Sequence, residues 1–391
     1  QFAHRLQQAP LPEEIEERAR VCLLNGYGIA LGCLGTPYAP VAVQAVLASE
    51  GEREGGATLL ADGRRSSIGG AALANSALFH GRAQEDTCGA AHLGAILIPL
   101  LTALVEAREQ DAASRLLPAL VAGYEVGGLL ENAYSGITTP GGLRSSPLYG
   151  TVAAAAATSS LLGLSVEQTA AALANAASFT GGILQSFDDG TDEWRYQVGV
   201  AGRTGWMATE LARAGSISAA HAFEGRSGFV RAYARTECDV PALVSRLGKQ
   251  WSIQRVTFKP FPVCAFNQTP VHAALALRER MAGQRIAAVR VRMHPYEAGY
   301  AGMDAMGPFD SVSGTLMSIP FCIAATLLHG APTMTRMTTY DDLDVNALVA
   351  RVQLRADETV PRLCCAVELD LEDGQTIAHD QRMTTDDYAY D

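Results

Sequence analysis

The chain has 391 residues, 48% of which are hydrophobic, a formal net charge of -11 and a pI near 5.3. A chain of this length and hydrophobic content can bury a large core and should divide into about two domains. The negative balance gives no broad basic surface and so argues against binding to a nucleic-acid backbone, which leaves small molecules and a second copy of the chain as the expected partners.

Apolar and alanine-rich segments at helical spacing, separated by glycine and proline, fill the first part of the chain and predict a mostly helical domain over residues 1–254. The expected helices are 13–33, 40–49, 69–79, 91–107, 112–130, 150–162, 166–177 and 200–214. Residues 147–163 are the most continuous weakly polar stretch, but they are rich in Ala, Ser and Thr, which indicates a buried helix and not a membrane span. No signal-peptide pattern opens the chain, so a cytoplasmic location is expected.

The pattern changes in the last third, where short alternating segments with β-branched residues predict strands. The expected strands are 286–293, 352–354, 366–371 and 376–377, and the expected helices are 269–282 and 313–328. Residues 255–391 are therefore expected to form a smaller α+β domain. The eight cysteines show no CxxC pair and no regular spacing, which favours buried, reduced thiols over a disulfide framework, a zinc site or an iron-sulfur cluster.

The first candidate site is the loop segment from His80 to His92, which also contains Glu85, Asp86 and Thr87. Two imidazoles and two carboxylates close together suit acid-base chemistry. The alternative is helix capping, in which Asp86 or Thr87 accepts from free backbone amides and His92 opens the next helix.

The second candidate is Lys259, which stands among aromatic residues and prolines at the expected domain junction. The chain has only one other lysine, Lys249, against many arginines. This usage indicates a task that arginine cannot perform, such as proton donation. The alternative is a lysine whose stem lies along a domain edge with its charge in water.

A third candidate segment, residues 188–203, places acids, Trp194, Arg195 and Arg203 before a helix expected to begin near Val198. The arginines could hold a substrate carboxylate or pair with neighbouring acids. The glycines between Gly26 and Gly32 resemble a dinucleotide-binding fingerprint, but they lie in a helical pattern without a preceding strand and are assigned to close helix packing.

Several motifs in order resemble the MmgE/PrpD family over nearly the whole chain. They are residues 24–32, 71–80, Asp86-Thr87 with His92, 161–164, Lys259-Pro-Phe-Pro, 307–309 and 318–321. The resemblance implies a large helical domain, a smaller α+β lid, a homodimer and a site between domain and lid, with Asp86, Thr87, His92 and Lys259 at the matching positions. Members usually return to the helical domain with a C-terminal helix, which is absent here or not covered.

The chain also departs from the family pattern at titratable positions. Ala83 stands where an acidic residue is common, and Arg144 stands where many members have a histidine. Trp194 and Gln197 replace a lysine and a histidine, and Gln268 replaces a histidine. The residues expected to bind substrate are therefore Thr87, Arg144, Trp194, Arg195, Gln197 and Gln268.

Together these features predict a lyase, either a dehydratase or a decarboxylase, that needs no cofactor or metal and moves a proton beside the carboxylate of a small acid. His92 is expected to be the base or acid, Lys259 its partner or an electrostatic stabiliser, and Asp86 an orienting group. An epimerase or isomerase of the same family and a catalytically silent carboxylate-binding protein remain alternatives. An oxidoreductase using the segment near Gly28 is a further one.

Overall fold

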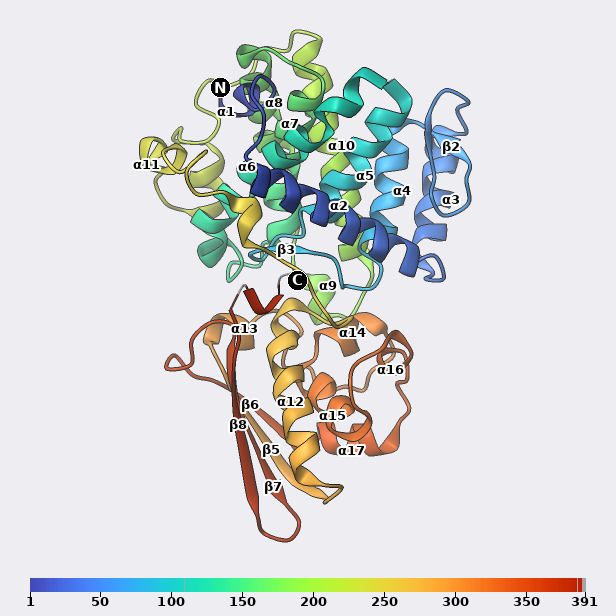
Figure 1. Cartoon of the computed structure of the whole chain (residues 1–391), viewed down its shortest axis with the longest axis vertical. Coiled ribbons are helices and arrows are strands. Elements are labelled where there is room, and N and C mark those ends of the chain that lie inside the picture. The colour runs from blue at the N-terminus through green and yellow to red at the C-terminus, as the bar shows by residue number, and fades with distance from the viewer. Residues whose placement is uncertain (109, 385, 389–391) are drawn as a thin grey trace. The chain divides into compact units, whose positions relative to one another are not determined.

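The computed structural model describes residues 1–108, 110–384 and 386–388, which form two compact units (Figure 1). The helical unit contains residues 1–81, 85–183 and 195–257, and the α+β unit contains residues 82–84, 184–194 and 258–391. The predicted fold class, a mostly helical domain with a smaller α+β domain, is confirmed. The segments 82–84 and 184–194 lie on the α+β side, although the sequence pattern places them in the first domain.

The helical unit is built around α7 (Ser145–Leu161), all 17 residues of which are buried. This burial confirms the prediction for the stretch after Pro147. Helices α5, α6 and α8 pack against α7, and α4 packs against α3 and α5. The helices of this unit are α1 (Phe2–Arg5), α2 (Glu13–Gly32), α3 (Tyr38–Glu50), α4 (Ile68–Phe79), α5 (Gly94–Arg108), α6 (Leu116–Thr138), α7, α8 (Val166–Phe179), α10 (Glu193–Arg213, from Arg195 on) and α11 (Val240–Val244).

Short elements complete the helical unit. They are the ladder of β1 (Ala57–Thr58) with β2 (Arg65–Ser66), the ladder of β3 (Thr87–Cys88) with β4 (Val256–Thr257), the 3-10 helices η1 (Gln110–Arg115) and η3 (Ser252–Arg255), and the π-helical turn η2 (Val230–Ala234).

Side-chain caps and polar first turns decide where several helices begin. Ser67 caps α4 by accepting from the Gly70 amide, and Ser165 with Gln168 forms a capping box at α8. Helix α10 begins at Glu193 and not near Val198. The prediction began too late because the first turn of α10 lies outside the apolar periodicity of residues 200–214. This correction places the segment around Trp194 on a helix.

The glycine-rich segment near Gly28 lies inside α2, and no strand precedes it among the described residues. A Cβ at Gly26 would come within 2.6 Å of Ile98 Cδ1, so this glycine allows α2 to approach its neighbours. Gly28 has no heavy atom within 4 Å of an added Cβ. Close helix packing at Gly26 is confirmed, and the dinucleotide fingerprint is not supported.

The α+β unit is a four-stranded sheet with helices on one face. The strand order is β6-β5-β7-β8, in which β5 and β6 are parallel and the other pairs antiparallel. Helix α12 packs against β7 and β8, and α15 against β6 (Figure 1). The strands are β5 (Ile286–Met293), β6 (Val352–Ala356), β7 (Cys364–Leu371) and β8 (Thr376–Arg382).

The helices of this unit are α9 (Gln185–Asp188), η4 (Ala265–Asn267), α12 (Gln268–Met281), α13 (Pro295–Ala298), α14 (Val312–Met317), α15 (Ile319–His329), α16 (Met334–Met337), α17 (Leu343–Val349) and η5 (Asp386–Tyr388). The single helix predicted over 313–328 is wrong, since Ser318 ends α14 and caps α15 by accepting from the Phe321 amide at 3.0 Å. Pro320 in the first turn of α15 fits this start. Within the described part of the chain, no helix combines the length and hydropathy of a membrane span.

Candidate functional site

The main polar cluster of the helical unit joins two histidines through one carboxylate. Glu85 Oε2 lies 3.1 Å from His80 Nδ1, and Glu85 Oε1 lies 3.0 Å from His92 Nδ1. His80 ends α4, and His92 precedes α5 by two residues. His80 and Glu85 are buried, whereas the His92 side chain is 17% exposed. The cluster therefore has a buried side and one imidazole that reaches an accessible surface.

Arg144 extends this cluster on the side of His80. Its guanidinium lies 2.7 Å from His80 Nε2 and donates to Gln197 Oε1 at 3.1 Å. Arg144 is buried at the start of α7, and Gln197 also donates to the Ile183 carbonyl at 3.1 Å. Two predicted substrate-binding residues thus contact one another and the histidine cluster. Their contact with substrate stays a prediction.

Asp86 is tied to two helices of the helical unit. Its carboxylate accepts from the Gly94 amide at 3.2 Å and from the Tyr124 hydroxyl. Burial first, and then the charge of Asp86, holds the pKa of Tyr124 well above its usual range. A Cβ at Gly94 would overlap the Asp86 carboxylate, so the first residue of α5 has to be glycine. The capping alternative is confirmed for Asp86, whose backbone carbonyl also lies 3.2 Å from His92 Nδ1.

Thr87 lies on β3, opposite Thr257 of β4. The two hydroxyls are 2.7 Å apart, and Thr87 is buried. This short ladder joins the segment that carries Glu85 to the segment that runs on toward Lys259. A hydrogen bond from Thr87 to substrate stays a prediction.

Two buried carboxylates of α6 hold the backbone on either side of this ladder. Glu131 accepts from the Ala90 amide at 2.9 Å. Glu125 accepts from the amides of Ser252 and Ile253, both at 3.0 Å, and burial raises its pKa to about 7. Helix α6 therefore anchors both the approach to His92 and the turn before β4.

Arg195 is buried in the helical unit and packs against aromatic and backbone groups. Its guanidinium carbon lies 3.8 Å from the centre of the Tyr38 ring, and Nε donates to the Gly81 carbonyl at 3.3 Å. A cation over an aromatic face is a favourable contact when both are removed from water. The clamp on a substrate carboxylate that the sequence predicts for Arg195 stays a prediction.

In the α+β unit, the loop that carries Lys259 is held by the side chain of Gln268. The Gln268 amide accepts from the Phe261 amide at 3.2 Å and donates to the carbonyls of Phe261 and Val263 at 3.0 and 3.1 Å. Both ends of the side-chain amide thus bind loop backbone. These contacts assign Gln268 to shaping the Lys259 loop, and its contact with substrate stays a prediction.

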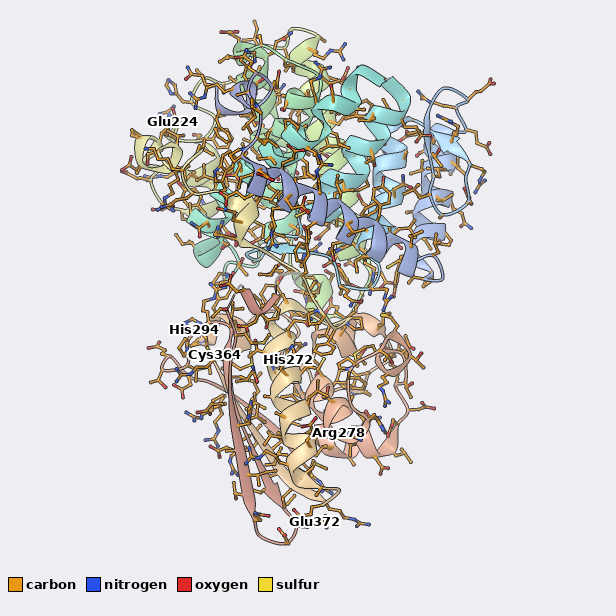
Figure 2. All side chains as sticks on the ribbon, in the orientation of Figure 1. Glu224, His272, Arg278, His294, Cys364 and Glu372 are labelled. Carbon is orange, nitrogen blue, oxygen red and sulfur yellow. The ribbon has the colours of Figure 1, made fainter. Side chains whose placement is uncertain are left out.

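His272, labelled in Figure 2, belongs to α12. Its ring packs on Phe261 of the Lys259 loop, with the ring centres 5.2 Å apart, and burial lowers the pKa of His272. Sequence reasoning gave this histidine no role.

Trp194 also belongs to the α+β unit, where its indole donates to Ser313 Oγ at 3.0 Å and packs on Phe187. Trp194 is therefore a core residue of this unit.

The predicted site residues fall into two sets. The helical unit holds Asp86, Thr87, His92, Arg144, Arg195 and Gln197, and the α+β unit holds Trp194, Lys259 and Gln268. Sequence reasoning named His80 and Glu85 but gave them no role. The signal in the sequence that could have indicated their role was the pair of imidazoles, His80 and His92, at the two ends of one short polar segment.

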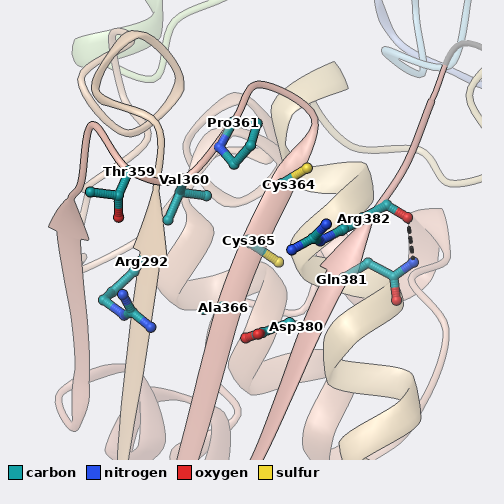
Figure 3. A pocket seen from close by; sticks show the side chains of 10 residues that line it. All are labelled: Arg292, Thr359, Val360, Pro361, Cys364, Cys365, Ala366, Asp380, Gln381 and Arg382. Carbon is teal, nitrogen blue, oxygen red and sulfur yellow. Dashed lines mark hydrogen bonds between the residues drawn. The ribbon is translucent and has the colours of Figure 1, made fainter.

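A separate hollow of about 160 Å³ lies on the outer face of the sheet in the α+β unit (Figure 3). Arg292, Arg382 and Cys364 are among the residues that line it, and Ala366 contributes a short side chain between neighbouring strands. None of the predicted site residues lines it. Among the residues that the structure describes, no three His, Cys, Asp or Glu side chains group as metal ligands do.

Comparison with known proteins gives matches along most of the chain. Residues 1–239 match the MmgE/PrpD N-terminal domain, and residues 261–384 match the MmgE/PrpD C-terminal domain. A cis-aconitate decarboxylase-like protein, oryM, of Aspergillus oryzae is 30% identical over 271 residues, which are 65% of this chain and 55% of that protein.

Two further relatives bear the name cis-aconitate decarboxylase. The protein of Aspergillus terreus is 24% identical over 362 residues, 87% of this chain and 73% of that protein. The mouse protein is 29% identical over 327 residues, 78% of this chain and 65% of that protein. The chain thus spans only about half of the Aspergillus oryzae relative.

Proposed function

Because the chain belongs to the MmgE/PrpD family, we propose that it is a cofactor-independent lyase that moves a proton beside the carboxylate of a small organic acid. The observation that carries this proposal is the Glu85 to His92 contact of 3.0 Å, in which a buried carboxylate supports a partly accessible imidazole. A histidine with a carboxylate behind it is a common general acid or base.

Each candidate reaction needs a side chain that transfers a proton to or from a carbon near the carboxylate. In a decarboxylation, the electron pair of the broken carbon–carbon bond moves into an unsaturated skeleton as carbon dioxide leaves, and the skeleton takes up one proton. In a dehydration, a base removes a proton next to the carboxylate and the hydroxyl leaves as water with a proton from an acid. We propose His92 for this proton transfer and Lys259 as its partner acid or as the positive charge that stabilises the developing anion.

We place decarboxylation first because the relatives from Aspergillus terreus and mouse are named decarboxylases. Dehydration by the same residues is the second form of the lyase proposal. Epimerisation, in which the proton returns to the opposite face of the carbon, would use the same acid-base pair and is the alternative. The homodimer implied by the family resemblance is part of the proposal and can be tested by light scattering.

The proposed substrate carries fewer negative charges than a tricarboxylate. Trp194 and Gln197 stand where the family pattern has two cationic donors. The Arg144 guanidinium already contacts His80 and Gln197, so some of its N–H donors are occupied by protein groups. Each missing charge-assisted hydrogen bond removes roughly 1.5 to 3 kcal/mol of binding.

The test is incubation of the purified protein with a panel of di- and tricarboxylates in heavy water. Proton NMR follows deuterium incorporation and new products, and His92→Ala is the control. With at least one substrate we expect either deuterium at one product carbon, as decarboxylation gives, or an unsaturated product with loss of water, as dehydration gives, and neither with the control. Binding of a carboxylate without exchange or product would favour the catalytically silent alternative. Exchange in recovered starting material with inverted configuration would favour an epimerase.

A further inference from the structure

The structure assigns positioning roles to residues behind His92, and this assignment rests on the proposed function. We infer that Glu85 and His80 are positioning residues that fix the tautomer of His92, so that Nε2 is its proton-transferring atom, and that Arg144 anchors this chain of contacts. The contacts run from Arg144 through His80 and Glu85 to His92.

The tautomer of His80 follows from its neighbour. A guanidinium has only N–H donors, so Arg144 must donate to His80 Nε2 across the 2.7 Å between them. Nε2 is then the unprotonated nitrogen, and the proton of the neutral ring sits on Nδ1. Nδ1 lies 3.1 Å from Glu85 Oε2, a contact at ion-pair distance that lacks the alignment of a hydrogen bond. Arg144 therefore fixes the tautomer of His80 and leaves its N–H on the side of Glu85.

The tautomer of His92 follows in the same way. Its Nδ1 lies 3.0 Å from Glu85 Oε1 and 3.2 Å from the Asp86 carbonyl oxygen. A carbonyl oxygen and an ionised carboxylate can only accept, so His92 Nδ1 carries the proton. The lone pair of the neutral ring is then on Nε2. A histidine whose Nδ1–H is held by a carboxylate is oriented to exchange protons through the other nitrogen.

Charge balance explains why the chain of contacts includes an arginine. Glu85 and Arg144 are both buried, and a buried charge is costly unless an opposite charge or hydrogen bonds compensate it. The neutral ring of His80 lies between the two charges. When His92 takes up a proton, Glu85 is the carboxylate that stabilises the imidazolium. His80 itself is buried with both ring nitrogens facing protein groups, which leaves proton exchange with substrate to His92.

The first experiment reads the tautomers directly in the unmodified protein. Long-range proton–nitrogen NMR distinguishes protonated from unprotonated ring nitrogens, and the His92 signals are assigned by their loss in His92→Asn. We expect neutral His92 with its proton on Nδ1. A neutral His92 protonated on Nε2 would overturn the inference. This measurement needs no substrate and reads the unmodified protein, with His92→Asn used only for assignment, so it stands apart from the proposed function.

The second experiment compares Glu85→Gln with Glu85→Asp and with Glu125→Gln. Glu125 is a buried carboxylate of the same unit that accepts from the backbone amides of Ser252 and Ile253. We expect Glu85→Gln to lower kcat about 10- to 100-fold with little change in KM, in the range seen when an outer partner of a functional histidine is lost. Glu85→Asp should recover part of kcat.

The pH dependence separates positioning from a merely structural role. In Glu85→Gln, the limb of the pH–rate profile that reports His92 should shift to lower pH, because the imidazolium loses its carboxylate. The NMR titration of His92 should shift in the same direction, and Glu125→Gln should leave both unchanged. If Glu85→Gln and Glu125→Gln behave alike, the inference is wrong even when the protein is an active lyase.

Discussion

The hydroxyl of Tyr124 donates a hydrogen bond to the carboxylate of Asp86, and both side chains are buried in the helical unit. Asp86 also caps α5 through the Gly94 amide. The acid that the family resemblance brings forward as catalytic is therefore engaged in holding two helices, and it is the backbone carbonyl of Asp86 that faces His92.

Replacement of Asp86 is expected to affect stability more than chemistry. Asp86→Asn should lower the free energy of unfolding by about 1.5 to 3 kcal/mol, the usual contribution of a hydrogen bond to a charged group. Urea denaturation measures this loss. Tyr124→Phe removes the same contact from the other side and should cost a similar amount. A stable Asp86→Asn protein with turnover as low as that of His92→Ala would mean that Asp86 takes part in catalysis.

His92 and Lys259 are expected to be needed for turnover and not for folding. His92→Ala and Lys259→Ala should each lower kcat about 10²- to 10⁴-fold, the typical contribution of a general acid or base. Circular dichroism and urea denaturation should stay close to those of the unmodified protein. Lys249→Ala, which changes the other, exposed lysine, is the matched control and should keep full activity. Near-normal turnover in either variant removes that residue from the proposal.

The substrate prediction is weak or no turnover of cis-aconitate and other citrate-like trianions, and better turnover of a less charged carboxylate. It is contradicted if kcat/KM for such a trianion reaches about 10⁴ M⁻¹s⁻¹, an ordinary value for an enzyme on its own substrate. Restoring the family residues with Trp194→Lys is not a clean test, because the indole packs on Phe187 and donates to Ser313. Gln197→His alone is the better variant and should raise the affinity for trianions.

Glu125 should make stability depend on pH. Burial raises its pKa from 4.5 to about 7, so between these values the folded state keeps a proton that the unfolded chain has lost. The contribution of Glu125 to stability therefore falls as pH rises from about 4.5 to 7, by about 3 kcal/mol in total at about 1.36 kcal/mol per unit.

Urea denaturation at pH 5 and pH 8 should show this fall in the unmodified protein and a smaller one in Glu125→Gln. Glu372→Gln, at the exposed turn between β7 and β8, should keep the slope of the unmodified protein (Figure 2). Equal slopes in all three proteins would mean that Glu125 is ionised throughout this range.

Activity is expected to survive exhaustive chelation, because the cysteine spacing follows no metal-site pattern and no three His, Cys, Asp or Glu side chains of the described residues group as metal ligands do. The measurement is turnover after dialysis against a strong chelator, compared with turnover after addition of single divalent metals. Loss of activity that one metal restores would contradict the expectation.

Many helices and strands were predictable because they bury one periodic face, as α2, α8 and β5 show. The predictions that differ from the structure depend on polar residues, which carry no such period. Helix α10 starts at Glu193, before the apolar pattern that predicts it. Ser318 divides a predicted helix whose apolar pattern continues across the break.

The candidate site was predictable only where its parts are close in sequence. His92 and Asp86 could be named from one segment, but which atom of Asp86 faces His92 depends on the capping of α5. The contact of Arg144 with His80 joins residues 64 positions apart, and a single sequence carries no pattern for such a pair. Whether Gln268 holds loop backbone likewise depends on the final path of the loop.

The ladder between β3 and β4 has a kinetic consequence. Its register pairs Thr87 with Thr257, which are 170 positions apart. Contacts of such long range form slowly, because the chain must give up the entropy of a very large loop before they contribute. During synthesis, α4 and α5 can pack together long before residue 257 has left the ribosome. The segment that carries Glu85 should therefore reach its final geometry late, and hydrogen exchange during refolding should protect the Thr87 amide after those of α5. The Cys88 amide donates to the nearby Ala91 carbonyl and does not report this pairing.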